Sequence, residues 1–488
     1  MVRVTILIVC LLGGLLGIAA GEAGPPPPGV RFSTAADAVR VVLDLPGAAA
    51  FTDRSTPRAA VVDVTLPLAR AVPVIAVNDP VVSGIAVTPD AAGMTVLTVS
   101  LLKPRKVNVF AVPAAEGKPF RVVVDVLKRF ALEESRDLSP AIRYTRLERQ
   151  TDDRYLLAHL LEVNAADPRV RIGAAAAAGD RERVSDMVAR TGAAAGVNGG
   201  YFLDGTRPVG LLKVDGQVLS LPLWGRTAAA FPPAGAPTFG NPAGRWRVTL
   251  PDGAVRDLPD YLDVSIAATP PEEAVISGMN FGATPHNPQG LTVVVRDGKI
   301  AARGTESAPL HRRDVAVLLR GERATALDAL LACDAPIAVT PVLDGAWAGV
   351  ATAVGAGPRL LRNGALENTA AAERFRADVA LGRPARTGLG VTAASRVILA
   401  VIEAPGPYGG GATLEELAAL LKARGATDAM NLDGGGSSCL VLGAETVTAP
   451  PGAWVRPVAS GILVYDDRVP PVKPAIAPAA VEEPAPAE

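Results

Sequence analysis

The residues with the clearest chemical potential form one short loop with the sequence DGGGSS at 433–438. Three glycines in a row lack Cβ atoms, so their backbone N–H groups can converge into a concave nest that binds an anion such as phosphate. The serine hydroxyls add donors. The predicted phosphate-binding residues of this loop are Gly434, Gly435, Gly436, Ser437 and Ser438.

Asp433 opens this loop directly after an apolar run. Its carboxylate could act as an acid or base, as a stabiliser of positive charge, or as a ligand of a divalent cation. The simpler alternative is a glycine-rich turn whose aspartate only accepts hydrogen bonds from backbone amides.

A second glycine pair lies in the segment NGGYF at 198–202. Asn198 at the end of a strand could orient a sugar hydroxyl or a phosphate through its amide, with Gly199 and Gly200 beside it. The alternative for Asn198 is an ordinary turn residue. Tyr201 could stack on a sugar or fill the core, and Phe202 is expected in the core.

Two arginines, each followed by a threonine, are candidates for binding one negative charge. A planar guanidinium matches a phosphodiester better than a diffuse basic surface does. We therefore predict phosphate binding by Arg226, Arg386 and Thr387. For each arginine the alternative is a surface or structural ion pair. Arg359, after a proline at a strand start, is more simply a solvated residue.

Phosphate leaves a sugar more readily than an alcohol does, so stabilising an oxocarbenium-like centre and activating water matter more than protonating the leaving group. A single carboxylate could suffice, and Asp433 is the first choice. Glu403 is a candidate partner. Asp204 and Asp344 both precede glycine, which is more typical of turns.

The counts of histidine and cysteine exclude other chemistry. The three histidines, His159, His286 and His311, form no HExxH motif, which argues against a zinc hydrolase. No GxSxG motif supports a serine hydrolase. Cys333 and Cys439 remain once the N-terminus is set aside, and whether they pair stays open. No cofactor is required, although a divalent cation at Asp433 remains open.

Regular elements must deliver these motifs to one place. Apolar residues at helical spacing predict a helix over 182–190 that ends at Gly192, followed by a strand that leads into NGGYF. Thr413 and Glu416 form a capping box that predicts a second helix, which ends at Gly425. The strand after it leads directly into DGGGSS.

The ordered set of motifs is more specific than any single one. NGGYF, Arg226, GAGPRLLRNG (355–364), RPARTGLGVT (383–392) and the run from 413 to 438 together resemble the phosphodiester glycosidase domain family over residues 140–466. The resemblance implies hydrolysis of a sugar-1-phosphodiester between the anomeric carbon and the phosphate oxygen, giving a free sugar and a phosphomonoester. Where the family usually has Asp-Gly-Arg, this chain has Glu403 followed by APGPYGGG, which leaves the identity of the substrate open.

Short strands dominate the region before residue 130. Period-2 runs at 39–45, 58–64, 94–101, 107–112 and 120–126, separated by turn residues, predict a β-sandwich. The repeated pattern of arginine, valines and aspartate resembles the AMIN domain over residues 30–128. That resemblance implies binding to peptidoglycan or the cell envelope. The simpler reading of Arg40 and Asp125 is a cross-strand charge pair.

The two ends of the chain differ in composition from the rest. Residues 1–23 have a basic start, an apolar run and small residues, which is typical of a signal peptide, with an uncleaved anchor as the alternative. Residues 24–29 form a proline-rich linker, and residues 467–488 form a Pro/Ala/Glu tail that is expected to be disordered. Neither composition can bury a hydrophobic core. We therefore predict a periplasmic or secreted protein with no integral membrane domain.

Composition bounds the remaining possibilities. The chain has 488 residues and a net charge of -1, so no overall basic field recruits nucleic acid. Abundant glycine and proline favour a β-rich α+β protein: an N-terminal β-sandwich and a larger mixed α/β catalytic domain. The expected substrates are glycosyl phosphates of envelope or exopolysaccharide glycans. The alternative function is a non-catalytic protein that binds envelope polysaccharide or peptidoglycan.

Overall fold

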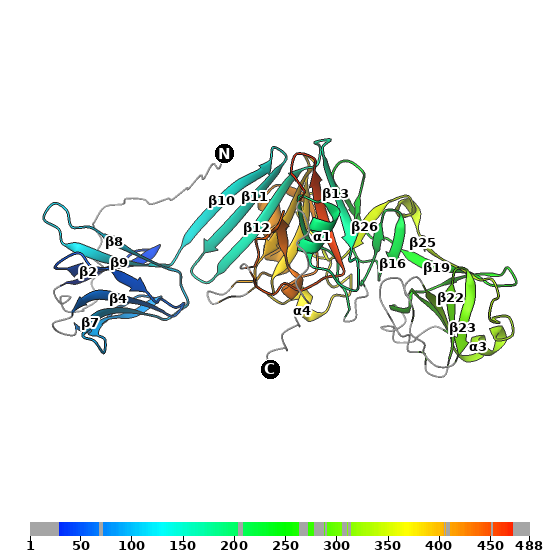
Figure 1. The fold of residues 1–488 in the computed structure, drawn as a ribbon, viewed down its shortest axis with the longest axis horizontal. Coiled ribbons are helices and arrows are strands. Elements are labelled where there is room, and N and C mark those ends of the chain that lie inside the picture. Colours follow the sequence, from blue (N-terminus) through cyan, green and yellow to red (C-terminus); the bar gives the residue numbers. More distant parts are fainter. Residues whose placement is uncertain are drawn as a thin grey trace.

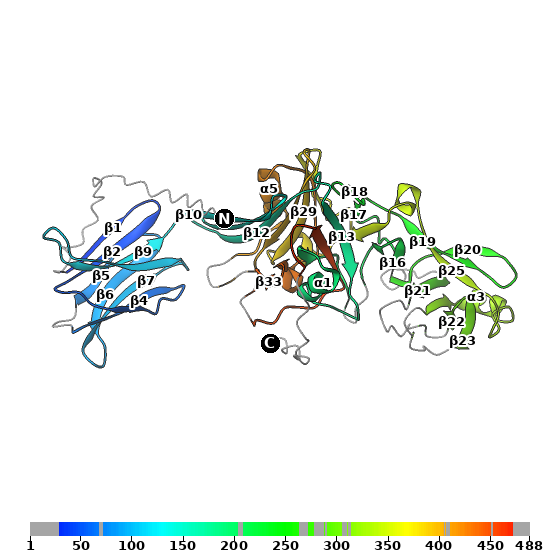
Figure 2. The same ribbon diagram turned by 45° about the horizontal axis from the view of Figure 1, so that its top comes forward.

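The computed structural model arranges the chain as three units along its longest axis (Figures 1 and 2). It describes residues 29–67, 72–203, 208–262, 272–277, 287, 290–304, 310, 314–404, 406, 410–449 and 452–471. The predicted signal peptide, nearly all of the proline-rich linker and most of the C-terminal tail lie outside these residues. So do Asp204, His286 and His311.

The N-terminal unit consists of two antiparallel sheets that share one hydrophobic cluster. One sheet has the order β1 (Val30–Thr34), β2 (Ala38–Leu45), β9 (Phe120–Leu127) and β8 (Val107–Val112). The other has the order β3 (Phe51–Asp53), β4 (Ala59–Pro67), β7 (Met94–Leu101), β6 (Val82–Pro89) and β5 (Val72–Ala76). The five predicted strands are confirmed as β2, β4, β7, β8 and β9.

Side-chain alternation explains the core of this unit. On β2, Val39, Val41 and Leu43 are buried while the residues between them are not. Arg40 lies directly opposite Asp125 on β9, and its Nε donates to the carboxylate at 2.7 Å. The predicted cross-strand pair is therefore confirmed. The AMIN resemblance of this unit stays a prediction.

The central body is built on an eight-stranded antiparallel sheet. Its strands, in spatial order, are β10 (Phe130–Ser139), β11 (Ile142–Gln150), β12 (Tyr155–Asn164), β30 (Arg396–Ile402), β29 (Arg386–Thr392), β31 (Ala426–Asn431), β27 (Arg359–Arg362) and β28 (Ala365–Leu366). β10 is an edge strand with few buried residues, so its polar sequence needs no core around it. The eight-stranded sheet thus begins at residue 130.

Two five-stranded sheets complete the central body and share its main hydrophobic cluster. The first has the order β13 (Val170–Ala176), β34 (Ser460–Asp466), β14 (Ala195–Asn198), β32 (Leu440–Leu442) and β33 (Glu445–Thr446). The second has the order β16 (Gln217–Ser220), β15 (Leu212–Val214), β26 (Thr352–Gly355), β17 (Ala228–Phe231) and β18 (Thr238–Gly240).

Both predicted helices form. α1 (Val184–Thr191) ends at Gly192 in the left-handed conformation, and α5 (Leu414–Ala423) has both hydrogen bonds of the Thr413–Glu416 capping box. α5 packs on the outer face of the eight-stranded sheet, where Leu417 lies against Gly388. The helices α3 (Gly321–Leu327) and α4 (Ala377–Ala380) are short. With 51% strand and 10% helix, the structure is strand-rich, which agrees with the expected β-rich α+β fold.

A third unit interrupts the central body, and its hydrophobic cluster extends to Ala228 and Ala353 of the second five-stranded sheet. It contains a sheet of β20 (Val255–Leu258), β19 (Gly244–Thr249) and β25 (Ala338–Leu343), and a sheet of β21 (Glu273–Ser277), β24 (Val315–Leu319), β22 (Leu291–Arg296) and β23 (Lys299–Gly304). This insertion, which the sequence analysis did not predict, separates Arg226 from the later motifs along the chain.

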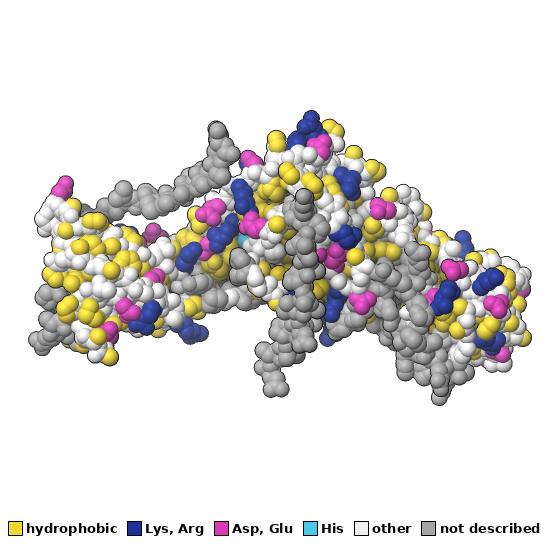
Figure 3. Space-filling view, in the orientation of Figure 1, with side chains coloured by type: hydrophobic (Ala, Val, Ile, Leu, Met, Phe, Trp, Pro, Cys, Tyr) yellow, Lys and Arg dark blue, Asp and Glu magenta, His cyan; other side chains and the backbone are white. Residues whose placement is uncertain are grey.

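Charge is distributed evenly over the visible surface. On the face drawn in Figure 3, basic and acidic side chains alternate over the central body without a large region of one sign. Within the part of the chain that the structure describes, no helix is long and apolar enough to cross a membrane.

Candidate active site

Strand direction brings the motifs together at one end of the central strands of the eight-stranded sheet. β29 pairs antiparallel with both β30 and β31, so it begins where its two neighbours end. Thr387 therefore lies near Asp433, which follows β31, while Glu403 follows β30. The end of β14 supplies Asn198, whose side chain reaches both neighbouring segments.

Asn198 is fully buried and connects three segments. Its Oδ1 accepts from Thr387 Oγ1 at 2.8 Å and from the Cys439 amide at 3.1 Å, and its Nδ2 donates to the Asp433 carbonyl at 2.7 Å. The side-chain oxygen of Asn198 therefore accepts two hydrogen bonds from within the protein. Asn198 therefore positions the segments of Asp433 and Thr387 relative to each other, and the substrate contacts predicted for Asn198 and Thr387 stay predictions.

The glycines of NGGYF allow close packing. A Cβ at Gly199 would come within 2.5 Å of Ser460 Oγ, and one at Gly200 within 2.4 Å of the Gly355 carbonyl. These positions therefore exclude any side chain for steric reasons. This packing accounts for both glycines, and the prediction that Gly199 and Gly200 bind substrate stays a prediction.

Asp433 is the half-buried carboxyl of the site. Desolvation raises its pKa to about 6, although hydrogen bonds from Ser437 and the Gly434 amide, and the charge of Arg456, act in the opposite direction. The Gly434 amide donates to Asp433 Oδ1 at 2.9 Å. A carboxyl with this pKa can exchange a proton near neutral pH, as a general base or acid must.

Three amides of the glycine-rich loop make hydrogen bonds to backbone carbonyls. The amides of Gly435, Ser437 and Ser438 donate to the carbonyls of Ala385, Gly434 and Gly435, at 2.8, 3.2 and 3.1 Å. The 3-10 turn Gly435–Ser437 uses these groups itself. These three amides are therefore already engaged, and phosphate binding by residues 434 to 438 stays a prediction.

The side chains of this loop have different surroundings. The Ser437 hydroxyl bonds to Asp433, whereas Ser438 Oγ is buried and has no hydrogen-bond partner among the described residues. A Cβ at Gly436 would lie 3.2 Å from Cζ of Arg456, so the guanidinium lies close against this glycine. Gly436 therefore makes room for Arg456.

Arg386 has a structural position. It is almost fully buried, and its guanidinium donates to the carbonyls of Ala412, Val379 and Gly382 at 2.9, 2.9 and 2.8 Å. Burial lowers its pKa. Adjacent strand residues point to opposite faces, so Arg386 lies on the α5 side while Thr387 bonds to Asn198. The guanidinium of Arg386 is therefore engaged by the backbone, and its predicted phosphate contact stays a prediction.

Arg226 has the open guanidinium that a phosphate site needs. It is half-buried against Phe375, 4.1 Å from Cζ to the ring centroid, and Nε donates to the Glu373 carbonyl at 3.3 Å. Burial lowers its pKa. Nη1 and Nη2 make no hydrogen bond to the described residues. Its neighbour Thr227 bonds to the Glu373 carboxylate, with Oγ1 at 2.6 Å from Oε1.

Tyr201 lies between the acidic and basic groups of the site. Its hydroxyl accepts from Asn431 Nδ2 at 2.7 Å and donates to the Gly357 carbonyl at 3.1 Å. Burial is the main cause of its raised pKa; the charge of Asp433 also raises the pKa, and the charges of Arg386 and Arg226 lower it. Asp433 and both arginines therefore lie near one phenol.

The sequence analysis missed Arg456. It makes no hydrogen bond or ion pair with the described residues, and its Nε is buried without a partner. Its charge lowers the pKa of Asp433. An unpaired arginine beside the candidate base is a natural anion ligand. No motif marks it, since it only precedes a proline before β34.

Glu403 belongs to a separate hydrogen-bonded chain at the same edge. His159 Nε2 lies 2.8 Å from Glu403 Oε1, and His159 Nδ1 lies 2.8 Å from the Tyr144 hydroxyl. The histidine is buried, whereas a third of the Glu403 side chain is exposed. β29 lies between β30 and β31, so the strand before Glu403 and the strand before Asp433 are not neighbours in the sheet. Glu403 is thus engaged by His159.

The other candidate residues lie elsewhere. Asp344 pairs with Arg245 of the inserted unit, and Arg359 pairs with Asp428. Phe202 packs against the cluster around α1, as predicted. Cys333 and Cys439 are both free thiols. Among the described residues, no group of three His, Cys, Asp or Glu side chains is arranged to hold a metal.

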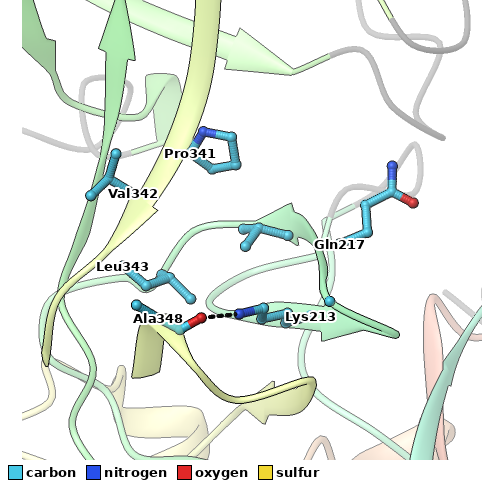
Figure 4. Close-up of a pocket in the computed structure, with 8 residues that line it drawn as sticks. Lys213, Gln217, Pro341, Val342, Leu343 and Ala348 are labelled. Carbon is cyan, nitrogen blue, oxygen red and sulfur yellow. Dashed lines mark hydrogen bonds between the residues drawn. The ribbon is translucent and has the colours of Figure 1, made fainter. Parts of the chain in front are cut away.

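A cavity of about 530 Å³ lies apart from these residues, between β15, β16 and β25 (Figure 4). Lys213 lines it, and its Nζ donates to the Ala348 carbonyl at 2.9 Å. That bond satisfies the amine without a ligand, and no candidate site residue lines this cavity.

Comparison with known proteins gives a partial family match. Residues 271–465 match the family model for phosphodiester glycosidase. The matched range includes Asp433, Glu403 and Arg456 but not Asn198 or Arg226. A comparison with curated proteins gave no match.

Similar solved structures support the fold. A hypothetical protein from Synechocystis is 21% identical, with 90% of this chain and 79% of that chain covered and a TM-score of 0.61. A protein from Burkholderia pseudomallei K96243 is 19% identical, with 93% and 100% covered and a TM-score of 0.52. The catalytic domain of zebrafish N-acetylglucosamine-1-phosphodiester alpha-N-acetylglucosaminidase is 16% identical over 74% and 88%; its TM-score of 0.34 is too low for a comparison of folds.

Proposed function

We propose that the chain hydrolyses sugar-1-phosphodiesters, with Asp433 as the catalytic carboxylate. The observation that carries this proposal is a half-buried carboxyl with a pKa of about 6 beside Arg456, a guanidinium without a partner among the described residues. The match of residues 271–465 to a phosphodiester glycosidase model supports the same reaction class.

Each group has a distinct role in this reaction. Arg456 and Arg226 bind the phosphate oxygens through charge-assisted hydrogen bonds. Ionised Asp433 takes a proton from water while the water oxygen bonds to the anomeric carbon. The bond between that carbon and the phosphate oxygen breaks, and its electron pair leaves with the phosphate. The products are a free sugar and a phosphomonoester dianion.

The fold keeps this geometry in place through Asn198 and Tyr201. Asn198 hydrogen-bonds to both the Asp433 carbonyl and the Thr387 hydroxyl, and Asn431 donates a hydrogen bond to the Tyr201 hydroxyl. Positioning groups of this kind lower the barrier by holding reactants at reactive distance. Because the ionised form of Asp433 is the active one, activity falls as pH falls through about 6.

The decisive experiment incubates the purified full chain with a panel of sugar-1-phosphodiesters and follows products by NMR. Asp433→Asn is the matched variant, because an amide oxygen can still accept from the Gly434 amide. We expect free sugar and phosphomonoester from the native chain and a loss of about 10²- to 10⁴-fold in the variant. Equal turnover by both proteins would contradict the role of Asp433.

The absence of turnover with every diester would reject the enzyme. Equal binding of envelope polymers by the native chain and Asp433→Asn would then favour the non-catalytic alternative. A parallel series with and without chelator tests whether a divalent cation takes part at Asp433.

The location and substrates are also part of this proposal. The N-terminal sequence supports a periplasmic or secreted enzyme that acts on envelope or exopolysaccharide glycosyl phosphates. The N-terminal unit would bind peptidoglycan or another envelope component. Cell fractionation, and sedimentation of that unit with purified peptidoglycan, test these two points.

A further inference from the structure

A cluster of aromatic and arginine side chains continues outward from the proposed phosphate site. The ring centroids of Tyr201 and Phe375 are 5.5 Å apart, and the guanidinium of Arg226 lies over the Phe375 ring. Arg226 also lies over Trp224, 5.9 Å from its centroid. Beyond it, Arg374 lies over the same indole at 5.2 Å. The order from the site outward is Tyr201, Arg226, Trp224 and Arg374.

Two turns far apart in sequence form this cluster, and a buried carboxylate joins them. Glu373 is only 3% exposed. Its Oε2 accepts from the Thr227 amide at 2.9 Å, and its Oε1 accepts from Thr227 Oγ1 at 2.6 Å and from the Arg359 amide at 3.2 Å. The turn that carries Trp224 and Arg226 is thereby fixed against the turn that carries Arg374 and Phe375. A site held in this way is preorganised for a ligand.

The backbone at both turns is unusual. Trp224 has φ of 48° and Arg374 has φ of 56°, in the left-handed region that large side chains rarely adopt. Such conformations cost free energy and concentrate at binding and catalytic sites. Here each one presents a side chain of the same cluster.

Arg226 and Arg374 also lack acidic partners. Neither makes an ion pair with the described residues, whereas Arg40 pairs with Asp125 and Arg424 pairs with Glu133. The carboxylate that lies closest in sequence, Glu373, is already satisfied by amide and hydroxyl donors. Two guanidinium groups on one indole therefore remain available for an external anion.

We propose that Trp224 and Arg374 form a subsite for a second anionic group of the substrate, beyond the scissile phosphate. This inference rests on the proposed function. Arg226 holds the phosphate that leaves, and Arg374 holds a carboxylate or a further phosphate on the group attached to it. The preferred substrates are then glycosyl phosphates within anionic polymers rather than diesters of a neutral alcohol.

The test uses three diesters that share one sugar 1-phosphate and differ in the attached alcohol. One alcohol is neutral, one carries a carboxylate and one carries a phosphomonoester. The native chain is expected to show about tenfold or higher kcat/KM for one or both anionic substrates than for the neutral one. The comparison between the two anionic substrates identifies which anion the subsite prefers.

Arg374→Gln removes the charge at an exposed position, so the fold should be retained. We expect it to reduce the preference for anionic substrates to within about twofold, mainly through KM. The matched control is Arg376→Gln, an exposed arginine two residues away with no aromatic contact among the described residues, which should keep the preference. Equal kcat/KM for all three substrates in the native chain, or an unchanged preference in Arg374→Gln, would overturn the subsite.

A binding measurement separates this inference from the proposed reaction. Calorimetry measures binding of the phosphate-bearing diester to Asp433→Asn and to the double variant that also has Arg374→Gln. This measurement needs no turnover. If no diester is hydrolysed but Arg374→Gln weakens binding about tenfold, the reaction is rejected and the anion subsite is kept. If hydrolysis occurs and Arg374→Gln binds as tightly as its parent, the subsite is rejected and the reaction is kept.

Discussion

Two Arg-Thr pairs in this chain look alike in sequence and behave in opposite ways in the structure. Arg386 is buried, and three backbone carbonyls take up its guanidinium, while Arg226 leaves two nitrogens open beside aromatic rings. Both threonines are fully buried, but Thr387 bonds to Asn198 and Thr227 bonds to Glu373.

The difference follows from local backbone structure. Arg386 begins β29, where alternation sends adjacent side chains to opposite faces of the sheet. Arg226 follows a tight turn at Trp224, just before β17, so it can lie over the aromatic rings while Thr227 points inward. An arginine beside a motif is therefore a candidate ligand only if its guanidinium is not already used by the backbone.

The largest expected effect is on stability, at Arg386. Arg386→Leu leaves the carbonyls of Ala412, Val379 and Gly382 without their donor in a buried place. We expect a loss of about 3 to 5 kcal/mol in the free energy of unfolding. Urea denaturation measures it, with Arg226→Leu as the control, for which a change within about 1 kcal/mol is expected. Equal losses in the two variants would remove the contrast.

Arg226 should instead affect turnover. Arg226→Gln removes the guanidinium group that would bind the phosphate. Loss of one hydrogen-bond donor to the charge that develops in the transition state lowers kcat by about 10²- to 10³-fold. Arg226→Lys keeps the charge but not the planar geometry, so it should recover only part of the rate. Steady-state kinetics with the best diester measures both. Full activity in Arg226→Gln would assign phosphate binding to Arg456 alone.

The contrast also shows what sequence could predict. Period-2 and helical spacing gave β2, β9, α1 and α5 correctly, because alternation and capping are local properties. Motif order placed Asp433 next to Asn198. Both results depend on patterns within a few residues or on an ordered set of motifs.

Other features depend on contacts between distant segments. The bond of the Gly435 amide to Ala385, the bond of Arg386 to Ala412, and the position of Arg456 against Gly436 join residues that are far apart in the chain. The inserted unit between Arg226 and Gly355 has ordinary strand patterns, so it did not stand out from the domain around it. Glycine spacing alone could not distinguish a nest from close packing.

A smaller effect separates the two threonines. Thr227→Val removes a donor to a carboxylate, whereas Thr387→Val removes a donor to a neutral amide. Hydrogen bonds to charged groups contribute about 1.5 to 3 kcal/mol, and neutral ones about 0.5 to 1.5 kcal/mol. Thr227→Val should therefore destabilise the chain more, as measured by urea denaturation. The reverse order would mean that the Asn198 network bears more of the stability than the Glu373 carboxylate does.

The smallest expected effect distinguishes Arg456 from Arg226 through pH. The positive charge of Arg456 lowers the pKa of Asp433, against the desolvation that raises it to about 6. Arg456→Gln removes that charge, so the carboxyl holds its proton to higher pH and the acid limb of the rate profile moves up by about 0.5 to 1. Arg226→Gln should lower the rate but leave the midpoint near 6. A pH profile of kcat/KM for the two variants checks this, and a downward movement in Arg456→Gln would mean that Asp433 is not the group that titrates. Arg456 would thus both bind the substrate and lower the pKa of Asp433, whereas Arg226 would only bind the substrate.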